Sequence, residues 1–216
     1  FPKLLRKAGY QTAMIGKWHL TSDPTGFDYW NILVGQGDYY NPIFIDNGEK
    51  RQIEGYATNI TTDLALDWLD NKRDKSKPFC LHKAPHRTWM PDTCDLRLYD
   101  DVTFPLPENF YDDYAGRIAA SEQEMSIIKD MDIVYDLKMA DKENEIHSSN
   151  ADLEKYGREL YNRMNPDQKA AWDAYYDPII QDFKAKKRTG KELAEWKYQR
   201  YMHDYLRVIH SVDRNI

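Results

Sequence analysis

The chain is 216 residues long, and its 30 lysines and arginines against 36 aspartates and glutamates give a net charge of −6. This length can bury a sizeable core in one domain or in two small ones, and the acidic balance argues against a general binder of nucleic acid or anionic lipid. No run approaches the roughly 18 apolar residues of a membrane-spanning helix, and two cysteines exclude a disulfide framework and a cysteine-rich zinc site.

The first third of the chain has the pattern of an open α/β sheet. Residues 1–9 predict the end of a helix that stops at Gly9, and residues 10–15 predict a strand that stops at Gly16. Because the chain begins and ends within amphipathic helical patterns, we expect it to be an internal segment of a longer protein.

Two more strands and a helix are predicted in the next part of the chain. Residues 43–45 predict a strand with a turn at 46–48, and residues 61–71 predict a helix capped by Thr61 or Thr62. The apolar run 78–81 predicts the next strand.

From residue 112 the pattern becomes helical, with helices expected at 112–138, 150–163, 166–187 and 189–213. Residues 165–168 read Asn-Pro-Asp-Gln, which is a good helix start. In the last helix an apolar series steps by three and four and predicts one buried face: Tyr198, Met202, Tyr205, Ile209 and Val212. We therefore expect an α/β region over 1–111 and a helix-rich region over 112–216.

Cationic side chains follow the first predicted strand. Lys17 and His19 alternate with Trp18, so an extended backbone would point both to one side and form a place for an oxyanion. In α/β sheets, ligands collect at the carboxyl ends of strands. The alternative is a solvated lysine and a loop histidine with a structural hydrogen bond.

A second cationic group follows the strand at 78–81. His82, Lys83, His86 and Arg87 lie within six residues, and Pro85 argues against the helix that a metal-binding histidine pair four residues apart would need. An anion site is the more plausible chemistry, and a solvated basic loop is the alternative.

Weaker candidates have simpler structural explanations. Asp112 and Asp113 favour the start of a helix over a sugar contact, and the Tyr39–Tyr40 pair favours aromatic packing over stacking on a sugar. Cys80 and Cys94 lack an activating environment.

Two of these motifs resemble a known family. Residues 9–20, GYQTAMIGKWHL, closely resemble the second signature of the type I sulfatases, and residues 83–86, KAPH, resemble the downstream Pro-His element of that family. Segments 24–30 and 205–216 look like the parts that follow the signature and precede a later metal-binding strand. Residues 35–42, GQGDYYNP, look most like the branch that acts on sulfated glucosamine in glycosaminoglycans.

The resemblance implies an alkaline-phosphatase-like α/β fold, truncated here at both ends, and hydrolysis of a sulfate ester on a sulfated carbohydrate. By motif, it implies that Lys17 binds sulfate, that His19 assists breakdown of a covalent intermediate and that His86 contacts sulfate near the bridging oxygen. Lys83 and Arg87 are the implied substrate-binding neighbours. The family uses a formylglycine nucleophile and Ca²⁺, and its members are periplasmic, secreted or lysosomal.

The chain also departs from the family pattern. Neither cysteine stands in the C/S-x-P-S-R sequence that becomes formylglycine, and the acidic calcium ligands are not recognisable, so we expect no metal site, no formylglycine and no turnover in this chain alone. We expect unpaired sheet edges to favour self-association. A related phosphohydrolase, such as a phosphonate monoester hydrolase, and a non-catalytic glycan-binding piece remain alternatives.

Overall fold

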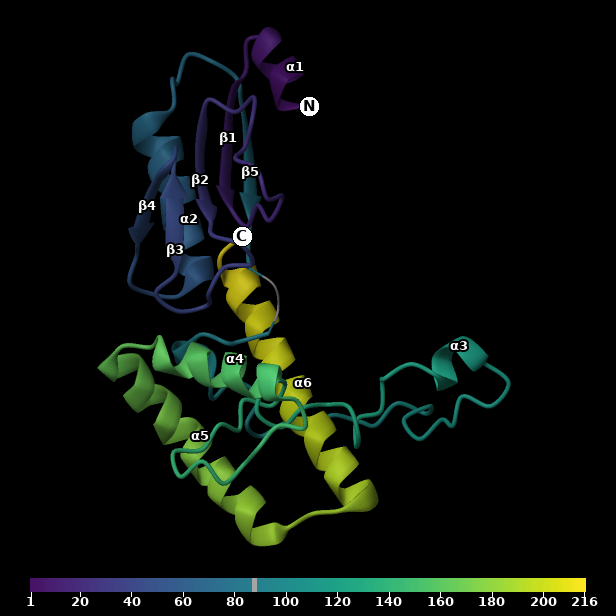
Figure 1. The fold of residues 1–216 in the computed structure, drawn as a ribbon. Helices are drawn as coiled ribbons and strands as arrows, with labels where there is room; N and C mark the ends of the chain where they lie inside the picture. Colours follow the sequence, from purple (N-terminus) through teal and green to yellow (C-terminus); the bar gives the residue numbers. More distant parts are fainter. Residues whose placement is uncertain (87–88) are drawn as a thin grey trace. The chain divides into compact units, whose positions relative to one another are not determined.

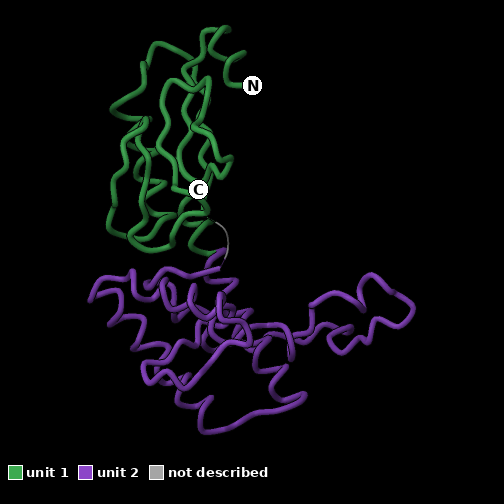
Figure 2. The backbone as a smooth tube through the Cα atoms, viewed as in Figure 1, with its two compact units in different colours: residues 1–88, 210–216 green, residues 89–209 purple. Residues whose placement is uncertain are grey.

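The structure is a computed structural model that describes residues 1–86 and 89–216. It divides into two compact units, coloured separately in Figure 2: unit 1 comprises Phe1–Thr88 with His210–Ile216, and unit 2 comprises Trp89–Ile209. The compact units therefore divide between residues 88 and 89. The boundary expected from the sequence lay between residues 111 and 112. Within the described residues, no helix is both long and apolar enough to span a bilayer.

Unit 1 holds the sheet (Figure 1). Its elements are α1 (Pro2–Lys7), β1 (Gln11–Gly16), β2 (Tyr29–Leu33), β3 (Ile43–Asp46), β4 (Glu49–Gln52), α2 (Ala57–Asp67), the π-helical turn η1 (Trp68–Lys72) and β5 (Phe79–Ala84). The strand order is β4-β3-β2-β1-β5. β1 runs parallel to both β2 and β5, while β3 and β4 form an antiparallel hairpin beside β2. The predicted α/β class is confirmed.

Helix α2 covers one face of this sheet (Figure 1). Two apolar clusters can be described in this unit among the described residues. One combines β1 with α2 and η1 through Ala13, Ile15, Ala65 and Trp68, and the other contains Leu33, Phe44 and Ile60. The predicted cap at Thr61 is wrong because the helix begins at Ala57, and the buried Thr61 hydroxyl donates instead to the Ala57 carbonyl at 2.8 Å.

Unit 2 carries the remaining elements: η2 (Thr93–Asp95), α3 (Ile118–Ser121), α4 (Ala151–Asn162), α5 (Pro166–Lys186) and α6 (Gly190–Arg214), whose last residues belong to unit 1. The predicted capping box at the start of α5 is confirmed: Asn165 accepts from the Gln168 backbone, and the Gln168 side chain accepts from the Asn165 backbone.

The helix predicted at 112–138 is wrong, because only the four residues of α3 are helical there. Aspartate side chains capture backbone N–H groups that a helix would use. Asp130 accepts from Ser126 N at 2.7 Å, and Asp132 accepts from Tyr135 N at 2.6 Å. Such local side-chain bonds compete with the helical ladder. Asp112 and Asp113 likewise close turns rather than start a helix.

The predicted buried face of α6 is also wrong. Tyr205 and Ile209 are 36% and 39% exposed, whereas the buried series is Ala194, Lys197, Arg200, Asp204, Arg207, Val208 and Ser211. Most of these buried residues are charged or polar. Asp204 is their centre, because it lies 3.1–3.5 Å from Lys138, Arg200 and Arg207.

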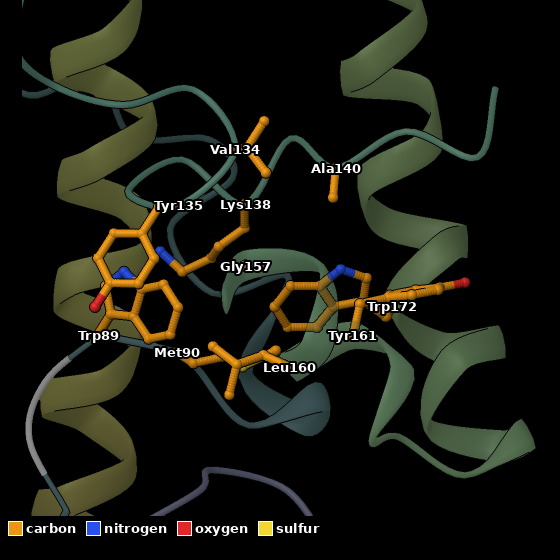
Figure 3. A pocket seen from close by; sticks show the side chains of 10 residues that line it. All are labelled: Trp89, Met90, Val134, Tyr135, Lys138, Ala140, Gly157, Leu160, Tyr161 and Trp172. Carbon is orange, nitrogen blue, oxygen red and sulfur yellow. The ribbon is translucent and has the colours of Figure 1, made fainter. Parts of the chain in front are cut away.

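Beside this charge cluster, unit 2 encloses a small cavity (Figure 3). The Lys138 side chain extends toward Trp89 and Tyr135, whose rings stack with centroids 4.3 Å apart, while Trp172 and Leu160 line another side. The cavity volume is about 20 Å³, which is room for about one water molecule and far too small for a sugar.

Candidate functional site

The three parallel strands of unit 1 end at the same edge of the sheet. Gly16, the last residue of β1, is in register with Ile32 of β2 and with Ala84 of β5. The Lys17 backbone N–H then donates to the Ala84 carbonyl at 2.9 Å. The segments that carry the two predicted cationic groups therefore leave the sheet next to each other.

Gly16 makes this approach possible. Its φ is +104°, and a Cβ atom built there would lie 2.0 Å from the Ala84 carbonyl oxygen and 2.8 Å from Thr61 Cγ2. No side chain fits in that space, so the residue before Lys17 has to be glycine.

The segment after Gly16 turns instead of remaining extended. His19 has a φ of 45° and Thr21 a φ of 59°, both in the left-handed region. The expectation that alternation points Lys17 and His19 to one side assumed an extended backbone, and the positive φ of His19 removes that premise.

His19 opens onto a cavity of about 330 Å³ at the ends of β1 and β2. The lining combines residues 18–23 with residues 32–35, Ile45 and Lys50. Of the three predicted catalytic residues, all of them described, His19 lines this cavity and Lys17 and His86 do not. Lys17 is half-buried and His19 is exposed.

His86 is buried two residues beyond β5, with 3% of its surface exposed. Its Nε2 lies 3.0 Å from the Gly37 carbonyl oxygen, and its ring lies against the Tyr39 ring with centroids 3.9 Å apart. Gly37 and Tyr39 belong to the loop that follows β2. This loop therefore contacts the segment that leaves the end of β5.

Lys83 is held by the end of α6. Its Nζ donates to the Asn215 carbonyl, which also accepts from the Thr62 hydroxyl at 3.1 Å. Burial lowers the pKa of the Lys83 amine. The predicted substrate contact of Lys83 stays a prediction, and the structure gives this amine a structural bond. Arg87 lies outside the described residues.

Lys17, His19 and His86 thus lie on segments that leave one sheet edge, but the cavity among the described residues that His19 lines is not lined by the other two. The loop after β2 reaches both that cavity, through Gly35, and His86, through Gly37. Sequence reasoning missed the contacts of Gly37 and Tyr39 with His86, and the glycines at 35 and 37 were the available signal. The reading of Tyr39 and Tyr40 as packing residues is confirmed: they are 0% and 2% exposed, and Tyr40 packs on Tyr56.

Among the described residues, the group of potential metal ligands that converges does not suit calcium, and neither cysteine has the sequence context of a formylglycine. Among the described residues, one group of three potential ligands converges: Asp92, Cys94 and Asp95, which lie in unit 2. A thiol with two carboxylates is a poor match for Ca²⁺, which takes six to eight oxygen ligands. Cys80 is followed by Leu-His and Cys94 by Asp-Leu, so neither has the formylglycine sequence.

Comparison with known proteins gives consistent results. The family model described as Sulfatase matches residues 1–216. The chain is 47% identical to an N-acetylglucosamine-6-O-sulfatase of Bacteroides thetaiotaomicron, over 100% of the chain and 39% of that protein. It is 30% identical to the N-acetylglucosamine-6-sulfatase of Homo sapiens, over 51% of the chain and 23% of that protein.

The fold matches a solved structure of BT4656 in complex with its substrate D-glucosamine-2-N,6-O-disulfate. The TM-score is 0.87 at 47% identity, and the match covers 99% of the chain and 44% of the solved chain. The chain therefore spans less than half the length of these relatives.

Proposed function

Because the chain belongs to the sulfatase family, we propose that it forms part of an enzyme that removes the 6-O-sulfate from glucosamine residues of sulfated glycosaminoglycans. The proposal rests on the match over the whole chain and on the substrates named for the relatives at 47% identity. It extends to the whole protein, of which these 216 residues supply one part.

The observation that carries the proposal is the bond between the Lys17 N–H and the Ala84 carbonyl. This bond fixes the GKWH segment beside the APH segment at the carboxyl ends of parallel strands, where α/β sheets collect their ligands. Two cation-bearing motifs that are 69 residues apart (86 − 17) in the sequence thus meet at one edge.

We assign Lys17, His19 and His86 to the sulfate group. A sulfate ester carries negative charge on its oxygens, and further charge develops on the bridging oxygen as the S–O bond breaks. Fixed cationic donors stabilise such charge more than water does, because they need no reorganisation during the reaction. Lys17 and His86 bind and orient the oxygens, and the exposed His19 works at the mouth of the site.

We propose that the nucleophile and the metal ligands come from residues other than these 216, and that the chain alone does not turn over. Cationic donors without a nucleophile bind and polarise an ester but do not supply the attacking atom. The proposed location of the whole protein is an extracytoplasmic compartment, as for the family.

The test measures sulfate released from glucosamine 6-sulfate by ion chromatography. The full-length gene product should release sulfate and the isolated chain should not. Lys17→Ala and His86→Ala in the full-length protein should each lower kcat by about 100-fold or more. His82→Ala is the matched control, since His82 is exposed on β5 and is given no role in the site.

Other outcomes would overturn the proposal in distinct ways. Faster hydrolysis of a phosphate or phosphonate monoester than of the sulfate ester would favour a phosphohydrolase. Binding of an unsulfated oligosaccharide as tight as that of the sulfated one, without turnover by the full-length protein, would favour a glycan-binding role. If Lys17→Ala had the same kcat as the control variant His82→Ala, the assignment of the site would be refuted.

A further inference from the structure

The loop after β2 holds the imidazole of His86 on two sides. The Gly37 carbonyl oxygen lies 3.0 Å from Nε2, and the Tyr39 ring, fully buried, lies 3.9 Å away between centroids at a tilt of 49°. His86 itself is 3% exposed, so the ring has little freedom to turn between these two contacts.

The bond to Gly37 fixes where the ring protons lie. A carbonyl oxygen accepts and cannot donate, so the hydrogen bond requires a proton on Nε2 in both the neutral and the charged ring. The proton that distinguishes the two charge states is then carried by Nδ1. A neutral His86 is consequently the tautomer with its proton on Nε2, and the ring donates to a sulfate oxygen only in its charged form, through the Nδ1 proton.

A side chain at residue 37 would crowd the ring of His86. The φ of Gly37 is +80°, and a Cβ atom would lie 2.8 Å from Leu33 Cδ1 and 3.1 Å from both Cδ2 and Nε2 of His86. The two histidine atoms that a Cβ would displace include the one that makes the carbonyl bond. Gly35, two residues earlier, also has a positive φ of +58°, but a Cβ there meets no atom within 4 Å.

From this geometry we propose that Gly37 and Tyr39 are positioning residues for His86: they select the tautomer with the proton on Nε2 and set the plane of the ring. The assignment of the tautomer stands on the contacts alone. Its consequence for catalysis rests on the proposed function, since only there does His86 touch the ester.

The pair Gly37→Ala and Gly35→Ala separates ring placement from backbone strain. Both variants put an alanine at a positive φ, and only Gly37→Ala presses on His86. Histidine-selective ¹⁵N labelling of the full-length protein, with the His86 signals assigned by their loss in His86→Ala, reports which ring nitrogen carries the proton. Wild type and Gly35→Ala should show a protonated Nε2 in the neutral ring, and Gly37→Ala should lose that signature.

Activity provides the second measurement. Gly37→Ala should lower kcat by about 10- to 100-fold with little change in KM, because small misplacements of a reacting group are costly. Because Gly35 lines the cavity beside His19, the control for activity is Gly48→Ala, which puts an alanine at a φ of +105° with nothing within 4 Å of its Cβ and should stay within about twofold of wild type. Thermal unfolding midpoints show whether each variant folds. The variant Tyr39→Leu removes the ring contact with His86 without crowding residue 37. Tyr39→Phe keeps an aromatic ring there and should restore the kcat that Tyr39→Leu loses.

Two results would overturn the proposal: a proton on Nδ1 in neutral wild-type His86, or a folded Gly37→Ala variant that keeps both the Nε2 signature and the wild-type kcat. Failure of the proposed function looks different. In that case His86→Ala would keep its activity while the tautomer assignment in wild type still held.

Discussion

The buried charge cluster of unit 2 allows a direct test of what holds α6 in place. We expect Asp204→Asn to destabilise unit 2 strongly. The Asp204 carboxylate is 1% exposed, contacts Arg207 at 3.1 Å, Lys138 at 3.3 Å and Arg200 at 3.5 Å, and accepts from the Tyr176 hydroxyl at 2.9 Å. Asparagine keeps the size of the side chain and removes the charge.

The expected magnitude follows from the partners left behind. At an effective dielectric constant of about 20, each ion pair at this distance represents about 5 kcal/mol of attraction before desolvation is subtracted. Removing one partner of a buried pair has a net cost of about 3–5 kcal/mol, because the other charge stays buried. Of the carboxylates that the structure describes in an ion pair with these three cations, Asp100 stays beside Arg207, and its side chain is 41% exposed. We expect a loss of at least about 3–5 kcal/mol, or about 6–20 °C in the unfolding midpoint.

The pH dependence gives an independent check. Burial acts to raise the pKa of Asp204, but Lys138, Arg200 and Arg207 outweigh it and hold the pKa below its usual range. A carboxyl group with a lowered folded-state pKa adds stability above its unfolded pKa and loses that stability as the pH falls through the folded value. Wild type should therefore lose stability below about pH 4. Asp204→Asn should lack that part of the acid sensitivity.

The assay is differential scanning calorimetry with hydrogen exchange across α6. The control is Asp177→Asn, since Asp177 forms an exposed pair with Lys142 that is worth less than about 1 kcal/mol. The prediction fails if Asp204→Asn and Asp177→Asn unfold within about 1 kcal/mol of each other.

Three further predictions concern unit 1. Gly16→Ala should destabilise the β1–β5 pairing by several kcal/mol in urea titrations, whereas Gly9→Ala, with a φ of +88° and nothing within 4 Å, should cost much less; equal losses would contradict the close approach. Lys83→Met should speed hydrogen exchange around Asn215, because it removes a bond to that carbonyl; unchanged exchange would show the bond to be unimportant. The isolated chain should self-associate with rising concentration in sedimentation velocity, since β5 has β1 as its one strand neighbour among the described residues; a concentration-independent monomer would refute this.

Strands β1, β3 and β5 and the starts of α4 and α5 could be predicted because their signals are local, whereas β2 and β4 were not predicted. An apolar run bounded by Gly9 and Gly16 indicated β1, an apolar run that starts at Pro78 indicated β5, and the Asn165 capping box indicated α5. The fold class followed from the order of these elements and from the family resemblance.

Where a prediction from the sequence is wrong, the cause is either a contact with residues far away in the sequence or a local hydrogen bond that competes with the predicted structure. The apolar series on α6 suggested the wrong face, because the buried face carries charges whose partners Lys138 and Asp100 lie far away in the sequence. The region 112–138 has helical composition, but its aspartates bind nearby backbone N–H groups in turns. Likewise, the glycines at 35 and 37 indicate a tight loop but do not identify His86 as the residue that the Gly37 carbonyl meets.

Asn215 is hydrogen-bonded to residues 59, 62 and 83, and these bonds have a consequence for synthesis on the ribosome. These bonds join residues 156, 153 and 132 positions apart. At about 5–20 residues per second, Asn215 is made about 7–26 s after Lys83. During that interval the nascent sheet lacks the hydrogen bonds that Asn215 makes to it, while all of unit 2 is synthesised. A chaperone that shields strand edges would therefore act on this chain before translation of α6 ends.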